Sequence, residues 1–283
     1  MQTINRKKIS ELIVEKIKKE GIKKLSLKYF NSGKINFLII KNLLPMELAD
    51  QLSMNFVRQN KMVHLNGVQE NKYVGVYFEK NEKIVEEALY SFQEDNVIKM
   101  ISKITNISDL AGDKELYAGG ISSMSKDCFL NPHIDNSHNR LMTKYRRLNL
   151  LYYVNKDWDA NKDGGELVLY PDGITSKQIL IANDFNSLVI FRTDNRSLHG
   201  VNPVKSETNR RKCISNYYFS NASPLGKKYY HSTSYVGFKG QFLKGSYLKA
   251  NGIARTIFKK ILFKLFKKSI STGLHKDNER IDN

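Results

Sequence analysis

The chain has few cysteines and no long apolar run, and both absences narrow its class. Its 283 residues include only two cysteines, Cys128 and Cys213, and no CxxC pattern. This argues against a disulfide scaffold or a zinc knuckle and favours a reducing compartment. No run of 18 apolar residues occurs, and the charged first ten residues lead into no signal-like apolar segment. We therefore expect a cytoplasmic protein that does not span a membrane.

Acidic residues are also scarce, and the excess of basic residues is unevenly distributed. Lys and Arg number 46 against 28 Asp and Glu, which gives a formal net charge of +18. Residues 1–28 hold nine Lys/Arg and three Glu, and residues 249–268 hold seven Lys/Arg and no acid. The basic character thus lies at the two ends, whereas a nucleic-acid enzyme more naturally surrounds its catalytic groove with cations. A nucleic-acid partner is disfavoured.

Apolar residues are numerous enough for a folded protein, and their spacing indicates helices first. Hydrophobic residues make up 41% of the chain, and the length suits one well-buried domain of about 200 residues with extensions. Helical spacing of isoleucines and leucine predicts a helix within residues 3–20. Residues 34–52 read as a strand, a turn and a helix beginning near Pro45, and residues 82–105 as one or two helices.

From about residue 116 the pattern changes to short β-rich runs separated by turn residues, which favours a sandwich or barrel. In residues 147–155 alternation separates a face that can be core from a face that can line a cavity. The core face comprises Leu148, Leu150, Tyr152 and Val154, and the cavity face comprises Arg147, Asn149, Leu151 and Tyr153.

One constellation of residues indicates a metal site. His133 and Asp135 stand two positions apart, and His199 follows a strand-like run 64 residues after Asp135. Two imidazoles and one carboxylate occupy one face of an Fe(II) octahedron and leave three adjacent positions open. Arg211 opens the strand-like run after His199, and its planar guanidinium matches a carboxylate. A metal with such an anchor indicates 2-oxoglutarate as co-substrate.

Four stretches carry a resemblance to the Fe(II)- and 2-oxoglutarate-dependent dioxygenases, specifically the prolyl 4-hydroxylase-like branch. They are "DCFLNPHID", "LYYVNKDWDANKDGGELVLYPD", "LHGVNPV" and "RRKCISNYYF". The resemblance spans about residues 116–220. It implies that His133, Asp135 and His199 are the catalytic iron ligands, and that Fe(II), 2-oxoglutarate and, as reductant, ascorbate are the cofactors.

The resemblance also implies the co-substrate contacts. Arg211 is expected to bind the 5-carboxylate of 2-oxoglutarate, with Tyr153 as a second hydrogen-bond donor. Arg210 competes for the anchor role. Counting back from Tyr217 along the strand places Arg211 on the same face at an even interval, so we favour Arg211 and expect Arg210 to point outward.

The C-terminal stretch 252–270 reads as a basic amphipathic helix. Such a helix can lie in an anionic membrane interface, pack on the core or form a dimer, and the sequence leaves these roles open. Its apolar side comprises Ile253, Ile257, Phe258, Ile261, Leu262 and Leu265, and its basic side Lys260, Lys264, Lys267 and Lys268.

We predict a mainly β fold with flanking helices (α+β) around a double-stranded β-helix, or jelly-roll, core. Residues 1–115 form a helical and strand support region, residues 116–222 the dioxygenase core, and residues 223–283 a basic extension with the amphipathic helix. The expected function is hydroxylation of a C–H bond in an unidentified acceptor, either a peptidyl proline by resemblance or an envelope glycan or lipid-linked intermediate.

Two other classes of function remain as alternatives. One is a non-enzymatic jelly-roll metal-binding module, and the other, less favoured, is a nucleic-acid oxidative demethylase. The oligomeric state stays open. Cytoplasmic localisation includes the option of peripheral contact at the inner face of the membrane.

Overall fold

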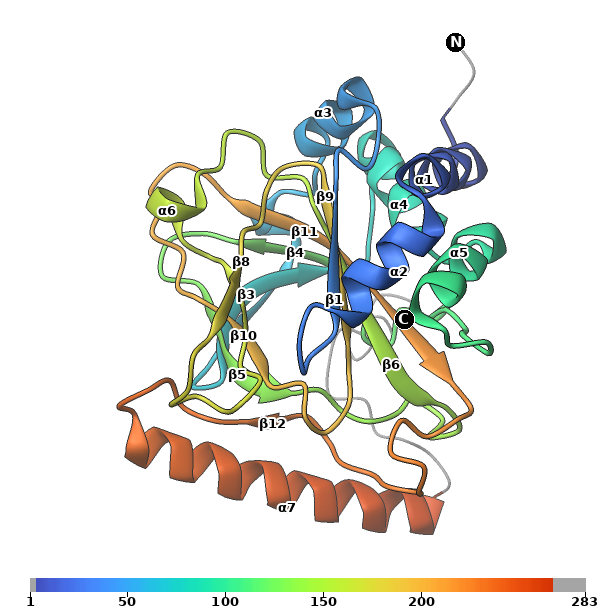
Figure 1. Cartoon of the computed structure of the whole chain (residues 1–283). Helices are drawn as coiled ribbons and strands as arrows, with labels where there is room; N and C mark the ends of the chain where they lie inside the picture. The colour runs from blue at the N-terminus through green and yellow to red at the C-terminus, as the bar shows by residue number, and fades with distance from the viewer. Residues whose placement is uncertain (1–3, 267–283) are drawn as a thin grey trace.

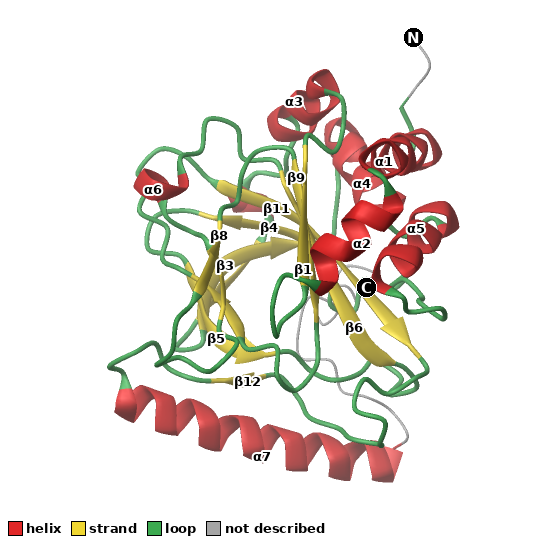
Figure 2. Ribbon diagram, viewed as in Figure 1, coloured by secondary structure: helices red, strands yellow, loops and turns green. Residues whose placement is uncertain are grey.

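The strands form one antiparallel sheet that curls into a half-barrel, and the helices lie outside it (Figures 1 and 2). The computed structural model describes residues 4–266. The predicted jelly-roll core with flanking helices is confirmed. The strands are β1 (Phe37–Lys41), β2 (Val63–Asn66), β3 (Glu70–Gly75), β4 (Gly120–Met124), β5 (Phe129–Ile134), β6 (Tyr145–Tyr153), β7 (Leu167–Leu169), β8 (Ile179–Ile181), β9 (Ser187–Arg192), β10 (His199–Val201), β11 (Arg211–Ser220) and β12 (Ser234–Tyr235).

Most of the helices lie beside the outer face of the sheet, the short α6 lies apart from them, and the last helix lies across an end of the half-barrel (Figure 1). Two short 3₁₀ turns, η1 (Gln59–Lys61) and η2 (Lys80–Glu82), accompany them. The α-helices are α1 (Arg6–Glu20), α2 (Ile22–Phe30), α3 (Met46–Met54), α4 (Lys83–Ser91), α5 (Asp95–Thr105), α6 (Ala160–Asp163) and α7 (Phe242–Phe266).

Helices α1, α2, α4 and α5 cover the outer face of the sheet with their apolar sides. In α1 the buried residues Ile9, Ile13 and Ile17 recur at the spacing of one helix face. They belong to the same core cluster as the core-side residues of β6, such as Leu148 and Leu150. Burial of these side chains fixes the sheet's outer face, so its inner face is left to form a cavity.

The N-terminal region also contributes strands to the sheet. β1 pairs with β9, β2 pairs with β3, and β3 pairs with both β4 and β5. Strands β2 and β3 were not expected from the sequence, because their short polar runs show little apolar alternation. The division into regions 1–115, 116–222 and 223–283 stays a prediction.

A β-bulge in β6 corrects one predicted face. Leu148 pairs with Tyr218 and Arg146 pairs with Phe219, so Arg147 has no partner on β11. An extra residue reverses the alternation on its far side. The prediction that Arg147 shares the cavity face with Asn149 is therefore wrong: Arg146 lines the cavity, and Nη1 of Arg147 donates to the carbonyl of Ala222 at 3.0 Å.

Helix α7 lies next to β12 at an end of the half-barrel, apart from the other long helices (Figure 2). Within residues 4–266, no helix combines the length and the hydropathy needed to cross a bilayer. Residues 267–270 of the predicted amphipathic stretch, with Lys267 and Lys268, lie outside the described residues.

Candidate active site

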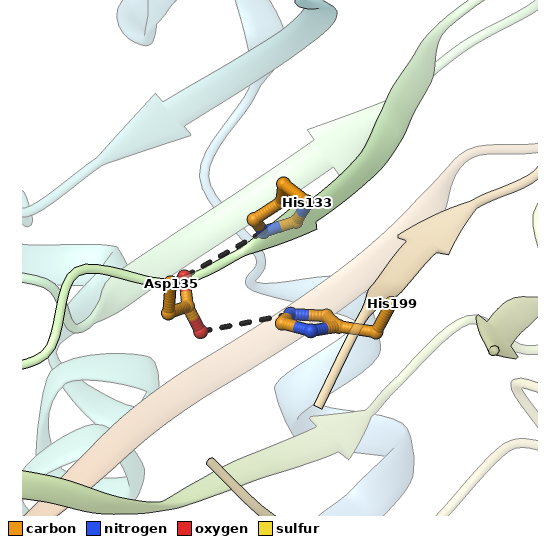
Figure 3. A group of neighbouring side chains, drawn as sticks. All are labelled: His133, Asp135 and His199. Atoms are coloured by element: carbon orange, nitrogen blue, oxygen red, sulfur yellow. Dashed lines mark ion pairs between the residues drawn. The ribbon is translucent and has the colours of Figure 1, made fainter. Parts of the chain in front are cut away.

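Two neighbouring strands bring His133, Asp135 and His199 together, and we call these residues the His-Asp-His cluster (Figure 3). β10 pairs antiparallel with β5, and His199 stands directly opposite His133. Asp135 Oδ1 lies 3.5 Å from His133 Nε2, and Asp135 Oδ2 lies 3.6 Å from His199 Nε2. The three candidate ligand atoms all lie within 4.8 Å of one another. The structure thus brings together the residues that the sequence predicted as ligands.

Backbone carbonyls orient both imidazole rings. Nδ1 of His133 lies 2.9 Å from the carbonyl oxygen of Asn131, and Nδ1 of His199 lies 2.8 Å from that of Ser197. Because a carbonyl can only accept, each Nδ1 carries the hydrogen and each Nε2 keeps its lone pair, an arrangement typical of metal-ligating histidines. The donor set of two imidazole nitrogens and one carboxylate oxygen fits a divalent ion such as Fe(II).

Two neighbours hold the carboxylate of Asp135. Nη1 of Arg146 lies 3.2 Å from Oδ1, and Nδ2 of Asn149 donates to Oδ2 at 2.9 Å. Burial alone would raise the pKa of Asp135, but the positive charge of Arg146 holds that pKa well below its usual value. The carboxylate is therefore ionised. Arg146 was not predicted from the sequence, because simple alternation assigns the cavity face to the next residue, Arg147.

Burial is the main cause that lowers the pKa of His199 to about 4. The imidazole of His199 is therefore neutral near pH 7, which is the state that binds a metal. The nearby His138 is not part of this group. It is buried, and its ring lies against that of Tyr145 with centroids 4.3 Å apart.

Arg211 is a buried cation in the same cavity as the cluster. Its Nε donates to the carbonyl of Gly165 at 2.8 Å, and its Nη2 donates to the hydroxyl of Tyr153 at 3.0 Å. Gly165 has a φ of +69°, and a Cβ there would stand 3.0 Å from Cδ of Arg211, so glycine is required. No carboxylate in the described part of the chain forms an ion pair with Arg211. Such a charge is costly unless an anion joins it.

The other predicted co-substrate residues lie outside the cavity lining. Nη1 of Arg210 donates to the carbonyl oxygens of Thr208 and Asn209, at 3.2 and 3.1 Å. Tyr153 is fully buried beside the Arg211 guanidinium, and burial raises the pKa of its phenol, which stays neutral. A direct contact between Tyr153 and the co-substrate stays a prediction.

The cavity itself has a volume of about 320 Å³, the size of a small-molecule site. Its walls come from the inner face of the curled sheet, with Leu151, Leu167 and Phe191 as apolar members. Arg255 and Lys259 of α7 line it as well. The cavity therefore has a wall of strands and a wall contributed by the last helix.

The part of the chain that contains the His-Asp-His cluster matches a known family. The family described as the 2OG-Fe(II) oxygenase superfamily matches residues 119–219. This match supports a 2OG-Fe(II) oxygenase domain, similar to the prolyl 4-hydroxylases, in this part of the chain. The family uses Fe(II) and 2-oxoglutarate, and its prolyl hydroxylases also use ascorbate.

Among curated proteins, the oxygenase domain is similar to Egl nine homolog 1 of Rattus norvegicus, with 29% identity over 125 residues, 44% of this chain and 33% of that protein. It is also similar to prolyl hydroxylase EGLN3 of Mus musculus, with 35% identity over 71 residues, 25% of this chain and 28% of that protein. The chain thus spans about a third of the length of these relatives, or less.

Two solved structures have the same fold. A Pseudomonas putida prolyl-4-hydroxylase superposes with a TM-score of 0.53 at 14% identity, over 69% of this chain and 98% of that one. A prolyl 4-hydroxylase of Phytophthora capsici gives 0.52 at 18% identity, over 90% of this chain and 78% of that one. At these identities the likeness shows the fold alone.

Proposed function

We propose that the protein is an Fe(II)- and 2-oxoglutarate-dependent dioxygenase that hydroxylates a C–H bond of an acceptor. The observation that carries this proposal is the presence of the His-Asp-His cluster and the unpaired Arg211 in one cavity. A structural metal would account for the cluster alone. It gives no reason to bury a guanidinium without a carboxylate partner, whereas a dicarboxylic co-substrate does.

The residues divide the work between holding the metal and orienting the co-substrate. His133 and His199 would each supply Nε2 and Asp135 an oxygen, on one side of the ion. Bound Fe(II), together with 2-oxoglutarate, supplies the activation of oxygen for C–H hydroxylation. Arg211 would receive the far carboxylate of the co-substrate.

Anaerobic reconstitution with Fe(II) and 2-oxoglutarate, followed by exposure to oxygen, tests the proposal. We expect succinate to form, faster with ascorbate and with one of four lysate fractions: peptides, glycans, lipids or nucleic acids. The stimulating fraction names the class of acceptor. If the iron-loaded protein releases no succinate above an Asp135→Ala control with any fraction, the dioxygenase proposal is wrong.

The chemical class of the acceptor is a separate question within this proposal. The name prolyl hydroxylase of the EGLN3 relative supports a peptidyl proline. The exposed apolar side of α7, described next, supports a lipid-linked or envelope glycan acceptor. If the protein demethylated nucleic acids, methylated oligonucleotides would stimulate succinate formation, and their binding would weaken steeply with added salt. The basic residues at the ends of the chain give little support to this alternative.

We further propose that α7 attaches the protein to an anionic membrane surface at the inner face of the cell membrane. The helix packs on the fold through its other side and leaves an apolar outer side in solvent. Seven Lys/Arg and no acid occur in residues 249–268, and each basic residue near an anionic leaflet adds about 1 kcal/mol. The outer side comprises Leu243, Tyr247, Ile253, Ile257, Phe258 and Ile261, each more than half exposed.

Vesicle co-sedimentation of the full chain tests this attachment. We expect binding to vesicles with phosphatidylglycerol and little binding to pure phosphatidylcholine. Ile257→Asp should weaken binding at least tenfold, because it puts a charge on the apolar outer side. Met54→Asp on α3, where the side chain is 74% exposed, is the matched control. A dimer in solution that Ile257→Asp dissociates, with no vesicle binding, would assign the outer side to a second copy instead.

A further inference from the structure

The inner side of α7 brings two cations to the cavity. Arg255 and Lys259 stand one helical turn apart and line the same cavity as the His-Asp-His cluster. Nη2 of Arg255 donates to the carbonyl of Thr233 at 3.1 Å, and its guanidinium lies over the ring of Tyr235. Nε of Arg255 is buried and has no hydrogen-bond partner. A donor so placed is available to a ligand in the cavity.

The other charged residues that line the cavity either form ion pairs with one another or have a proposed ligand, whereas Arg255 and Lys259 have neither. Lys72 pairs with Glu70 at 2.9 Å, and the Arg146 guanidinium pairs with Asp135. Arg211 is the candidate anchor for the co-substrate. Within residues 4–266 no ion pair involves Arg255 or Lys259.

Their proximity is itself unfavourable without an anion. Burial and the charge of Arg255 both lower the pKa of Lys259, so neither cation stabilises the other. An anion held between them would relieve the repulsion and give the free Nε of Arg255 an acceptor. Glu70 also lies close enough for the charge of Arg255 to help lower its pKa, but Glu70 forms its ion pair with Lys72. In the described part of the chain no carboxylate forms an ion pair with Arg255 or Lys259.

The position of this pair relative to the metal ligands shows what the anion belongs to. In the pairing of β12 with β5, Tyr235 stands opposite His133, and the two rings lie 5.1 Å apart. The guanidinium of Arg255 lies over the same Tyr235 ring. A molecule bound by both α7 cations would therefore extend beside the His-Asp-His cluster, where an acceptor must lie.

We propose that Arg255 and Lys259 bind a phosphate or carboxylate group of the acceptor, so that the substrate class is an anionic molecule. This inference rests on the proposed dioxygenase function and deepens it. The outer side of the same helix favours a lipid-linked phosphate as the source of the group. A free phosphorylated metabolite offers the same chemistry, and the experiment separates the two sources.

The first measurement is anion binding to the anaerobic holoprotein saturated with Fe(II) and 2-oxoglutarate, so that Arg211 is already occupied. Inorganic phosphate and glycerol 3-phosphate are the probes, with glycerol as the uncharged comparison, and binding is read by calorimetry and thermal shift. We expect the double variant Arg255→Gln/Lys259→Gln to lose at least tenfold in phosphate affinity. Lys259→Arg should keep most of it, since the charge remains.

The matched control is Lys249→Gln, which removes a charge from an exposed position of the same helix that does not line the cavity. It should bind phosphate as the wild type does. Equal phosphate affinity in the double variant and the wild type would overturn the proposal. So would a rise in the KM for 2-oxoglutarate in the double variant as large as that in Arg211→Ala, because the cations would then belong to the co-substrate site.

The second measurement uses acceptor-dependent succinate formation, with lysate separated into acidic and neutral fractions and lipid extracts presented in vesicles. We expect the acidic fraction to stimulate the wild type, and the double variant to show at least a tenfold higher KM for that fraction. Stimulation by vesicles identifies a lipid-linked source, and stimulation by soluble phosphate esters a free one. Stimulation by neutral peptides alone would contradict the proposal.

The two proposals fail differently. A wild-type protein that forms no succinate under any condition refutes the dioxygenase function, while phosphate binding that depends on Arg255 and Lys259 would still be measurable. Succinate formation without phosphate binding refutes the anion site and leaves the dioxygenase intact.

Discussion

The two walls of the cavity are built in different ways. The strand wall carries the His-Asp-His cluster and Arg211, and its ladders connect to a buried core on the outer face of the sheet. The helical wall is α7, and among the side chains of α7 that the structure describes Leu248 is the fully buried apolar one. The other described contacts of α7 are hydrogen bonds, chiefly between Thr256 and Ser232, and two cations over aromatic rings, Lys244 over Phe129 and Arg255 over Tyr235. The wall that is continuous with the buried core thus bears the groups that need fixed geometry, and the wall with fewer described apolar contacts bears Arg255 and Lys259.

The strand wall predicts the largest effect. His199→Ala removes one of three ligands, and because even residues that only orient a ligand are worth about 10–100-fold in metal affinity, the loss should exceed that range. We expect iron binding and succinate formation to fall below detection in an anaerobic Fe(II) titration. His64→Ala on β2, an exposed histidine outside the cavity, should behave as the wild type does. Stoichiometric iron in His199→Ala would show that the cluster is not the metal site.

Arg211 gives the next largest effect on the same wall. Truncating one partner of a buried, hydrogen-bonded charge pair costs about 2–5 kcal/mol, so Arg211→Ala should raise the KM for 2-oxoglutarate at least roughly 30-fold. Arg211→Lys should recover only part of the loss, because an ammonium cannot make the planar double contact. Arg210→Ala is the control, since its guanidinium contacts backbone carbonyls outside the cavity. If Arg210→Ala has the larger effect, the anchor has been assigned to the wrong arginine.

The strand wall could be predicted from the sequence because its residues lie in regular strands. His133 and Asp135 at the end of β5 and His199 at the start of β10 meet through ordinary antiparallel pairing. The parity of β11 likewise distinguishes Arg211, which lines the cavity, from Arg210, which does not. Where the strand is irregular, the same reasoning fails. The bulge at Arg147 shifts the cavity-facing arginine by one position, and no alternation rule indicates where an extra residue sits.

The helical wall could not be predicted for a different reason. Amphipathicity identifies the apolar side of a helix, but it does not say what covers that side. α7 docks through small and polar residues instead: Gly252 approaches β12 so closely that a Cβ would lie 3.2 Å from the Cβ of Ser234. Arg255 and Lys259 therefore enter the cavity from a side of the helix that hydrophobic periodicity does not single out.

A smaller effect is expected from Arg146, which contacts the carboxylate of Asp135 but is not itself a candidate metal ligand. Arg146→Gln removes the charge that lowers the pKa of Asp135, so that pKa should rise towards the value favoured by burial. Protons then compete with iron for the carboxylate at a higher pH than in the wild type. As the solution is acidified, the variant should therefore lose iron before the wild type does. At pH 7 we expect iron affinity to fall about 10–100-fold. Arg147→Gln, whose side chain points outward, should leave the iron titration curve in place at every pH.

The smallest expected effect is on the free energy of local opening of α7. Oγ1 of Thr256 lies 2.7 Å from Oγ of Ser232 and accepts from its backbone N–H at 3.2 Å. Thr256→Val removes these bonds, and a net loss of about 1 kcal/mol corresponds to a roughly fivefold increase in local opening. Hydrogen exchange read by mass spectrometry should therefore show faster exchange in α7 and β12 and no change in β6, β9 or β11. Thr175→Val, the same change in an exposed turn, is the control.

The result bears directly on the contrast between the walls. If α7 opens independently, the acceptor can enter while the metal ligands stay fixed, and Thr256→Val should raise the KM of the acceptor more than it lowers kcat. If exchange rises equally in α7 and in the sheet, the helix and the strands unfold as one cooperative unit. The acceptor would then enter without a separate opening of α7. Any selectivity for anionic acceptors would come from the charges of Arg255 and Lys259 alone, and not from movement of the helix.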